Sequence, residues 1–184
     1  MSHADRTIAL ETGLSAIMPR EWDALHDGGN PFAGHDFLAL LEQSGSVGSG
    51  TGWQAAPLTV RGPDGTLLAA APAYLKSHSQ GEYVFDHGWA EAWERAGGSY
   101  YPKLQIAVPF TPVPGPRLLA VDEEAALLLL RAAEALVHQH ELSSAHATFV
   151  EPSQIPLFEK AGWLIRRDIQ FHFQNDGYAS FDDF

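Results

Sequence analysis

The fold is decided by residues 104–150, which read LQIAVPFTPVPGPRLLAVDEEAALLLLRAAEALVHQHELSSAHATFV. The run LQIAV predicts a short buried strand, and a proline-rich loop follows it. Residues 122–141 predict a helix, and residues 147–150 predict a second strand. In this strand–loop–helix–strand order, the loop and the start of the helix lie at the carboxyl edge of the first strand. Anionic ligands and acyl carriers tend to bind at that edge in α/β proteins.

The predicted helix at 122–141 has strong local signals. Asp122, Glu123 and Glu124 favour its start, through capping and through their charge against the helix dipole. Its polar residues recur every three or four positions and form one stripe: Arg131, Glu134, His138 and Glu141. Nearly all other residues are Leu, Ala or Val, so we expect this helix to lie mostly buried against a sheet.

The rest of the chain predicts further short elements. Strands are expected at residues 7–10, 56–61, 66–75 and 164–174. Helices are expected at residues 19–26, 35–43, 87–96 and 153–160, with Asp86 as the cap of the third. The sequence Gly62-Pro63-Asp64-Gly65 predicts a hairpin turn between two of the strands.

Composition excludes several classes of function. The chain has 184 residues and a formal net charge of −12, which disfavours nucleic acid or an anionic membrane as the main partner. It has no cysteine, which excludes disulfides, thiolate nucleophiles and cysteine-based metal sites. The first residues show no signal-peptide pattern and no apolar run reaches about 18 residues, so we expect a cytoplasmic protein.

The end of the sequence predicts an interrupted element. Ser180-Phe181-Asp182-Asp183 has the form of a helix capping box. We therefore expect residues 1–178 to form one domain and residues 179–184 to begin a helix that leads into a second one. The alternative is a frayed acidic tail.

Two sets of motifs carry a family resemblance. The element order, with PLFEKAGW at 156–163, resembles the core of the GNAT acyltransferase superfamily. The segments YLKSHSQGEYVFD at 74–86, YYPKL at 100–104, PFTP at 109–112 and GPRLL at 115–119 resemble the FemAB-like peptidoglycan biosynthesis/recognition family. The resemblance implies an α/β (α+β) fold: a mixed, mainly antiparallel sheet flanked by helices, usually doubled as two GNAT-like halves. It also implies acyl transfer from acetyl-CoA or another acyl-CoA to an amine. The alternative is aminoacyl transfer from aminoacyl-tRNA to a peptidoglycan precursor.

The same resemblance points to a carrier-binding loop. In GNAT enzymes, backbone N–H groups of a glycine-rich loop hold the pyrophosphate of the carrier. The equivalent loop here would use Phe110, Thr111, Gly115 and Arg117, but three prolines remove N–H donors from it. Arg117 could supply a bidentate phosphate contact instead. The alternative is a rigid surface loop in which Arg117 makes a salt bridge.

Acylation of an amine needs a base and an acid. Glu151, at the end of a predicted strand, is the candidate base, although a capping or surface carboxylate is the more common role. Phe158 stands where GNAT enzymes often have a tyrosine that acts as the general acid. A phenylalanine cannot donate a proton. Tyr101 is the second candidate catalytic residue.

Polar and aromatic residues before residue 104 are candidates for acceptor binding. Tyr100, Tyr101 and Lys103 could line a substrate cleft together with Asp86; alternatively, one tyrosine packs inside and Lys103 is solvated. Trp89 and Trp93 share one helical face, which favours the core over sugar stacking.

Two weaker patterns carry less. His78-Ser79 with Glu82 or Asp86 has the residue types of nucleophilic catalysis, but a turn between strands is the more common explanation. His138 and His140 face different directions on a helix, so no metal site is predicted.

The leading hypothesis is therefore an acyltransferase half of the FemAB-like type. The alternatives are a degenerate half that recognises a cell-wall or peptide ligand, and a half that structurally supports a catalytic partner.

Overall fold

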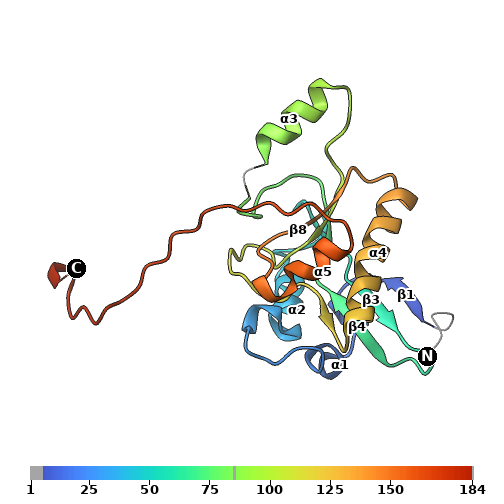
Figure 1. Ribbon diagram of the computed structural model, residues 1–184, viewed down its shortest axis with the longest axis horizontal. Helices are drawn as coiled ribbons and strands as arrows, with labels where there is room; N and C mark the ends of the chain where they lie inside the picture. The colour runs from blue at the N-terminus through green and yellow to red at the C-terminus, as the bar shows by residue number, and fades with distance from the viewer. Residues whose placement is uncertain (1–5, 85, 184) are drawn as a thin grey trace.

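The computed structural model describes residues 6–84 and 86–183, and it contains two four-stranded sheets (Figure 1). Neighbouring strands are antiparallel except for β6 and β8, which are parallel. The first sheet has the order β1 (Thr7–Leu10), β3 (Leu58–Arg61), β4 (Leu67–Ala71), β7 (Leu119–Ala120). The second has the order β2 (Trp53–Ala55), β5 (Ala73–Lys76), β6 (Lys103–Ile106), β8 (Ala145–Ala147). The mixed, mainly antiparallel architecture expected from the sequence is confirmed.

Two prolines divide what the sequence predicts as one hairpin. The strands expected at 56–61 and 66–75 break at Pro57 and at Pro72, because proline cannot donate to a sheet ladder. The Ala56 N–H still donates to the Ala73 carbonyl at 2.9 Å, a typical length for a sheet hydrogen bond, so pairing continues across the break. The hairpin therefore contributes one half of its length to each sheet.

The described residues form five α-helices: α1 (Pro19–Asp23), α2 (His35–Gln43), α3 (His87–Arg95), α4 (Glu123–Gln139) and α5 (Ile155–Lys160). The expected bounds of α2 are confirmed at both ends. The Asp122 carboxylate accepts a hydrogen bond from the Ala125 N–H at 2.7 Å, which caps α4. The Leu and Ala face of α4 packs against both sheets and forms the main core.

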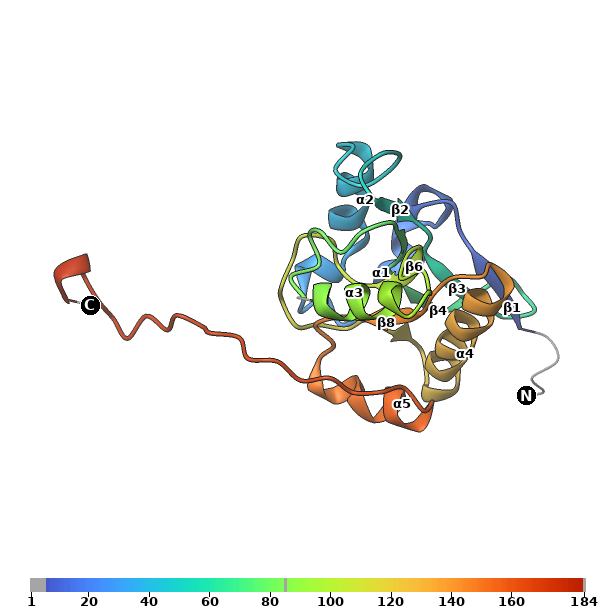
Figure 2. The same ribbon diagram turned by 90° about the horizontal axis from the view of Figure 1, so that it is seen from above.

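Two expected strands differ from the structure. β8 ends at Ala147 because Phe149 has a left-handed backbone (φ 53°), and Val150 bridges to Gly115 instead. The strand expected at 164–174 does not form: this segment is extended, and it lies outside both sheets (Figure 2). At the end of the described chain, Phe181–Asp183 forms one 3₁₀ turn.

Candidate functional site

The second sheet has one apolar and one polar face. Side chains alternate along its strands, so Leu75, Leu104 and Ile106 face the core beneath α4. The opposite face carries polar or aromatic side chains that are at most 1% exposed: Trp53, Tyr74, Lys76, Lys103 and Gln105. Charged groups at this depth require partners. Several of these come from residues 79–84 and from Asp86, which cover the polar face and are together called the segment 79–86 here.

Lys103 is the centre of this arrangement. Its ammonium is fully buried and donates to Glu82 Oε2 and to Asp86 Oδ2, each at 2.8 Å. A third hydrogen bond, 3.0 Å long, goes to Ser79 Oγ. The interpretation of Lys103 as a solvated residue is therefore wrong. All three donors of the ammonium are used, which holds the segment 79–86 against β6.

Asp86 gathers three donors on one oxygen. Its Oδ2 accepts hydrogen bonds from Lys103, from Ser79 Oγ and from Tyr100 OH, the last two at 2.9 Å. Asp86 precedes α3, but its side chain makes no capping bond, so its predicted role as a cap is wrong. Burial raises the pKa of Asp86, yet the bonds and charge of Lys103 outweigh this effect, and the net pKa is lowered. The carboxylate is therefore ionised at neutral pH.

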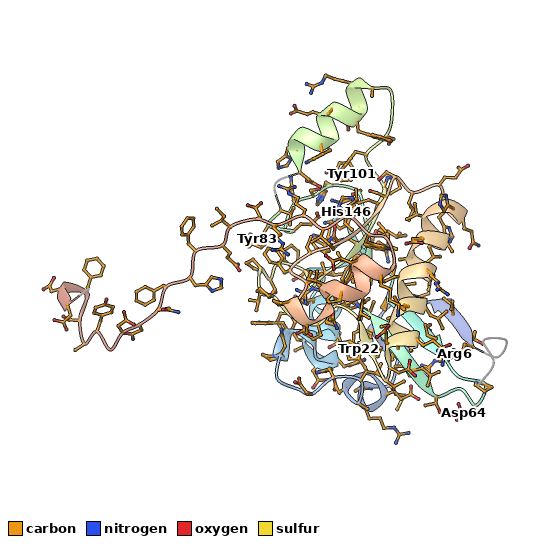
Figure 3. The ribbon with its side chains drawn as sticks, viewed as in Figure 1. Arg6, Trp22, Asp64, Tyr83, Tyr101 and His146 are labelled. Atoms are coloured by element: carbon orange, nitrogen blue, oxygen red, sulfur yellow. The ribbon has the colours of Figure 1, made fainter. Side chains whose placement is uncertain are left out.

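Ser79 and Tyr101 extend the network outward. Ser79 Oγ lies 2.7 Å from Tyr101 OH. A serine has one hydroxyl proton, and Ser79 gives it to Asp86, so the Tyr101 hydroxyl is the donor in this contact. Tyr101 is half-buried, whereas Ser79, Asp86 and Lys103 are buried. Tyr101 is therefore the outer member of a chain of hydrogen bonds that ends at Asp86. The Tyr101 side chain is labelled in Figure 3.

Lys76 and Glu82 form a second ion pair that the sequence analysis missed. Lys76 Nζ lies 3.4 Å from the centroid of the Trp53 ring and donates to the Gln80 carbonyl at 3.2 Å. It lies 3.9 Å from Glu82 Oε1. Burial lowers the pKa of Lys76 to about 7, and burial raises the pKa of Glu82, partly offset by Lys103. The strand register could have indicated that Lys76 belongs to the cluster, because Lys76 and Lys103 are directly paired on adjacent strands.

His146 on β8 lies next to the tyrosines. Its ring centroid is 6.0 Å from that of Tyr100, and its Nε2 is 2.8 Å from Ser144 Oγ. Burial, together with the charge of Lys103, lowers the pKa of His146 to about 4. The imidazole is therefore neutral at pH 7, and it adds no charge to the cluster.

The expected carrier loop lies at the other end of β6. Within this loop, the Phe110 N–H donates to the Gly81 carbonyl at 3.2 Å, and the centroid of the Phe110 ring lies 5.5 Å from that of Trp53. Thr111 Oγ1 donates to the Pro109 carbonyl at 3.0 Å. The Gly115 N–H donates to the Phe149 carbonyl at 3.0 Å, so this donor is already used. The loop thus connects the segment 79–86 with the end of β8.

Arg117 is buried beneath this loop. Its guanidinium donates to the carbonyl oxygens of Val113, Pro116 and Thr148, at distances of 2.8–3.1 Å. Burial lowers the pKa of Arg117 to about 10, so it is still charged at neutral pH. Arg117 therefore holds the loop in place, and a phosphate contact by its side chain would require these bonds to break.

The remaining candidates lie apart from the cluster. Glu151 follows β8 at its carboxyl end and accepts a hydrogen bond from Ser153 Oγ at 2.7 Å, while Tyr101 precedes β6 at its amino end. The Phe158 ring is buried, as its apolar character suggests. Trp89 and Trp93 are 68% and 53% exposed on α3, so the expectation that they lie in the core is wrong.

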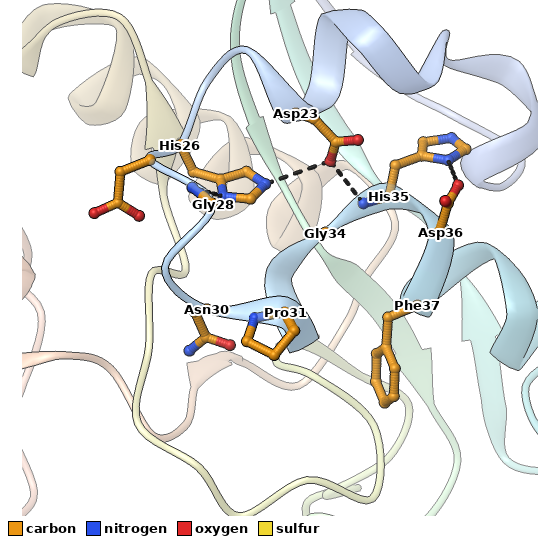
Figure 4. Close-up of a pocket in the computed structure, with 10 residues that line it drawn as sticks. Asp23, His26, Gly28, Asn30, Pro31, Gly34, His35, Asp36 and Phe37 are labelled. Carbon is orange, nitrogen blue, oxygen red and sulfur yellow. Dashed lines mark hydrogen bonds and ion pairs between the residues drawn. The ribbon is translucent and has the colours of Figure 1, made fainter.

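A shallow pocket between α1 and α2 lies elsewhere on the body (Figure 4). There Asp23 Oδ1 accepts from the His35 N–H at 2.9 Å and lies 3.4 Å from His26 Nε2. The pocket contains none of the candidate site residues. Among the described residues, no group of His, Asp and Glu side chains is arranged to hold a metal ion.

A protein-family comparison now decides the relationship. The model for FemAB-like proteins, described as peptidoglycan biosynthesis/recognition, matches residues 13–184. The chain belongs to the FemAB-like family. No match was found among curated protein sequences.

One solved structure supports the fold of this FemAB-like chain. Aminoglycoside N-acetyltransferase AAC(6')-Iy in complex with CoA is 12% identical, with a TM-score of 0.53, over 92% of this chain and 94% of that chain. A protein assigned as an acetyltransferase from Deinococcus radiodurans R1 is 16% identical, with a TM-score of 0.47, over 95% of this chain and 92% of that chain. The GNAT-like fold expected from the sequence is confirmed. No helix in residues 6–84 or 86–183 has the length and apolarity needed to cross a membrane.

Proposed function

We propose that this FemAB-like domain transfers an acyl group to an amine, with the cluster around Lys103 as its chemical centre. The observation that carries the proposal is the hydrogen-bond chain Tyr101–Ser79–Asp86, with Lys103 bonded to both inner members. A buried chain of this kind can move a proton between its two ends, which amine acylation requires.

The proton balance of the reaction suits this chain. The amine nitrogen attacks the carbonyl carbon of a thioester, so a C–N bond forms and the C–S bond breaks. We propose that Asp86 takes the proton lost by nitrogen, while Tyr101 gives its proton to the departing thiolate. Both hydroxyl groups then rotate, so that Ser79 accepts a proton from Asp86 and donates its own to Tyr101, which restores the starting state. Asp86 Oδ1 is buried and has no hydrogen-bond partner among the described residues.

Acyl-CoA is the proposed donor, with aminoacyl-tRNA as the alternative. Phe110, Thr111 and Gly115 would face the carrier, and Arg117 would hold their loop in shape. The net charge of −12 favours the smaller donor, because tRNA binding depends on clustered basic side chains. Glu151 is the alternative base, and its replacement by Gln in the assay below separates it from Asp86.

The acceptor would be a small amine, a peptide or a peptidoglycan precursor. Tyr100, Tyr101 and Lys103 are its proposed contacts, and Asp86 lies among them. The exposed indole of Trp89 on α3 supplies a stacking surface near this end of the sheet. We also propose that residues 179–184 lead into a second GNAT-like half, and that the protein works in the cytoplasm.

A second candidate is a domain that binds such a ligand without chemistry. Two observations favour it: the buried Arg117 guanidinium donates to three backbone carbonyl oxygens, and Phe158 cannot act as an acid. This candidate predicts saturable binding of the acceptor with neither carrier binding nor turnover.

Thiol release from acetyl-CoA distinguishes the two candidates. The chain has no cysteine, so a thiol reagent reports only free CoA. Acyl transfer predicts CoA release that requires an added amine, such as a lysine-containing peptidoglycan stem peptide, and that Asp86→Asn reduces strongly. Acceptor binding without any CoA release would favour the recognition domain.

A further inference from the structure

Residues 164–174 have the sequence of a strand but lie outside both sheets. Ile169 and Phe171 alternate with Gln170 and His172, which is the period-2 pattern of a strand with one buried face. In the structure, Ile169 is 81% exposed and Phe171 is 94% exposed. Two large apolar side chains on the same face of an extended segment are costly to leave in water.

Residues 164–174 are called the arm here. The start of the arm is attached to its own domain. Trp163 Nε1 donates to Glu134 Oε1 at 2.7 Å, just before the arm, and Gln170 Nε2 donates to the Pro112 carbonyl at 2.5 Å. Beyond that point the chain runs away from the body in both views (Figures 1 and 2). Ile169 and Phe171 are therefore exposed and bury little surface against this body.

A matching sheet edge exists at β8. β8 is the last strand of its sheet and pairs only with β6 among the described strands. The Ser144 carbonyl and the Thr148 N–H both form hydrogen bonds with β6. Because these bonds alternate along a strand, the N–H and C=O groups of Ala145 and Ala147 point away from β6, to the unpaired side of β8. Both alanines belong to the apolar face of the sheet, which a strand with bulky side chains would extend.

We propose that the arm of one chain adds as a strand to the β8 edge of a second copy of this chain, and that the second copy returns its own arm. This exchange satisfies the open peptide groups of β8 and buries Ile169 and Phe171 against the apolar face. The exchange is symmetric, as expected for a two-fold dimer.

Area and charge both favour a second copy as the occupant. Each phenylalanine buries about 150–250 Å². Two arms and the two edges that they cover therefore approach the lower end of the about 1,200–2,000 Å² of stable interfaces. The arm carries Arg166 and Arg167 against Asp168 alone, whereas the whole chain has a net charge of −12. A basic arm is attracted to an acidic body.

Cross-linking between two single-cysteine variants tests the exchange, because the natural chain has no cysteine. One variant carries Ala147→Cys and the other carries Phe171→Cys, with Ile169→Cys as a second arm position. After mixing and mild oxidation, the proposal predicts a mixed disulfide that joins the two variants in preference to either homodimer. Folding of an arm onto its own β8 edge cannot produce that product.

Oligomeric state in solution supplies the second readout. The unmodified chain should be a dimer by light scattering, Phe171→Lys should shift it to monomer, and the matched His172→Lys on the other face should stay dimeric. A monomer at every concentration, or a dimer that Phe171→Lys leaves intact, would overturn the proposal. Neither readout depends on acyl transfer, so its failure is distinct from failure of the proposed function.

Discussion

Lys103 Nζ lies 2.8 Å from Asp86 Oδ2, although the two residues are 17 positions apart and α3 lies between them. Asp86 directly precedes α3, and Lys103 begins β6 after it. Their contact therefore joins the two ends of the segment that carries α3 away from the body. It also fixes Asp86 beside Ser79, which completes the hydrogen-bond chain to Tyr101. One buried ion pair thus sets both the local fold and the candidate site.

Replacing Lys103 with Met should destabilise the domain strongly. The change leaves Glu82 and Asp86 buried without their cation, and loss of one partner of a buried pair costs about 3–5 kcal/mol. Lys160→Met is the matched control, because Lys160 makes an exposed ion pair with Glu123 that should be worth about 0–1 kcal/mol. Urea unfolding measures both variants. Equal small effects would mean that the buried cluster contributes little to stability.

Lys76 should make stability depend on pH in the basic range. Burial lowers its pKa from 10.5 to about 7, so between these values the unfolded chain binds more protons than the folded one. The free energy of unfolding should therefore rise as pH increases from about 7 to 10.5, and the contribution of Lys76 should level off below about 7. Lys76→Met should reduce that slope, whereas Lys160→Met should leave it unchanged. A slope that Lys76→Met does not alter contradicts the lowered pKa.

Tyr101→Phe should reduce turnover far more than acceptor binding. If Tyr101 protonates the thiolate, loss of its hydroxyl should lower kcat by about 100- to 10,000-fold with little change in KM. Tyr74→Phe is the control: its hydroxyl is buried on the same face of the sheet and has no hydrogen-bond partner among the described residues. Steady-state thiol release compares the two variants. Similar rates for both would remove Tyr101 from the mechanism.

Arg117→Lys should weaken the fold before it affects any ligand. A lysine cannot reach all three carbonyl oxygens, and each carbonyl left without a donor costs about 1–3 kcal/mol. Arg131→Lys on the exposed side of α4 should change almost nothing. Unfolding experiments together with CoA titration separate the two roles. Unchanged stability combined with weaker CoA binding would show that Arg117 contacts the carrier directly.

Local sequence signals were sufficient for much of the fold. The apolar stripe and the acidic start of α4 predicted a helix packed on a sheet, and the bounds of α2 were correct at both ends. Pro57 and Pro72 were visible in the sequence, but their division of one hairpin between two sheets depends on their being nearly opposite each other. That relationship exists only once the strands have paired.

The candidate site was harder to predict, because its charges are satisfied over long separations. The sequence identifies Lys103 and its tyrosines as candidates, but it does not predict that Lys76 and Glu82 are buried as a pair, since neither has a local pattern that indicates burial. Asp86 directly precedes α3 and therefore resembles a helix cap. Its carboxylate instead accepts a hydrogen bond from Lys103 and makes no capping bond. For Trp89 and Trp93, helical spacing placed both on one face but could not show whether that face meets the core.

Calorimetric titration of acetyl-CoA into the chain, followed by CoA as competitor, shows whether this domain binds an acyl-CoA donor. Acyl transfer on this domain predicts saturable binding of one acetyl-CoA per chain, displaced by CoA, with affinity retained in Tyr101→Phe. Absence of binding heat at any concentration of a folded chain would contradict acyl-CoA as the donor.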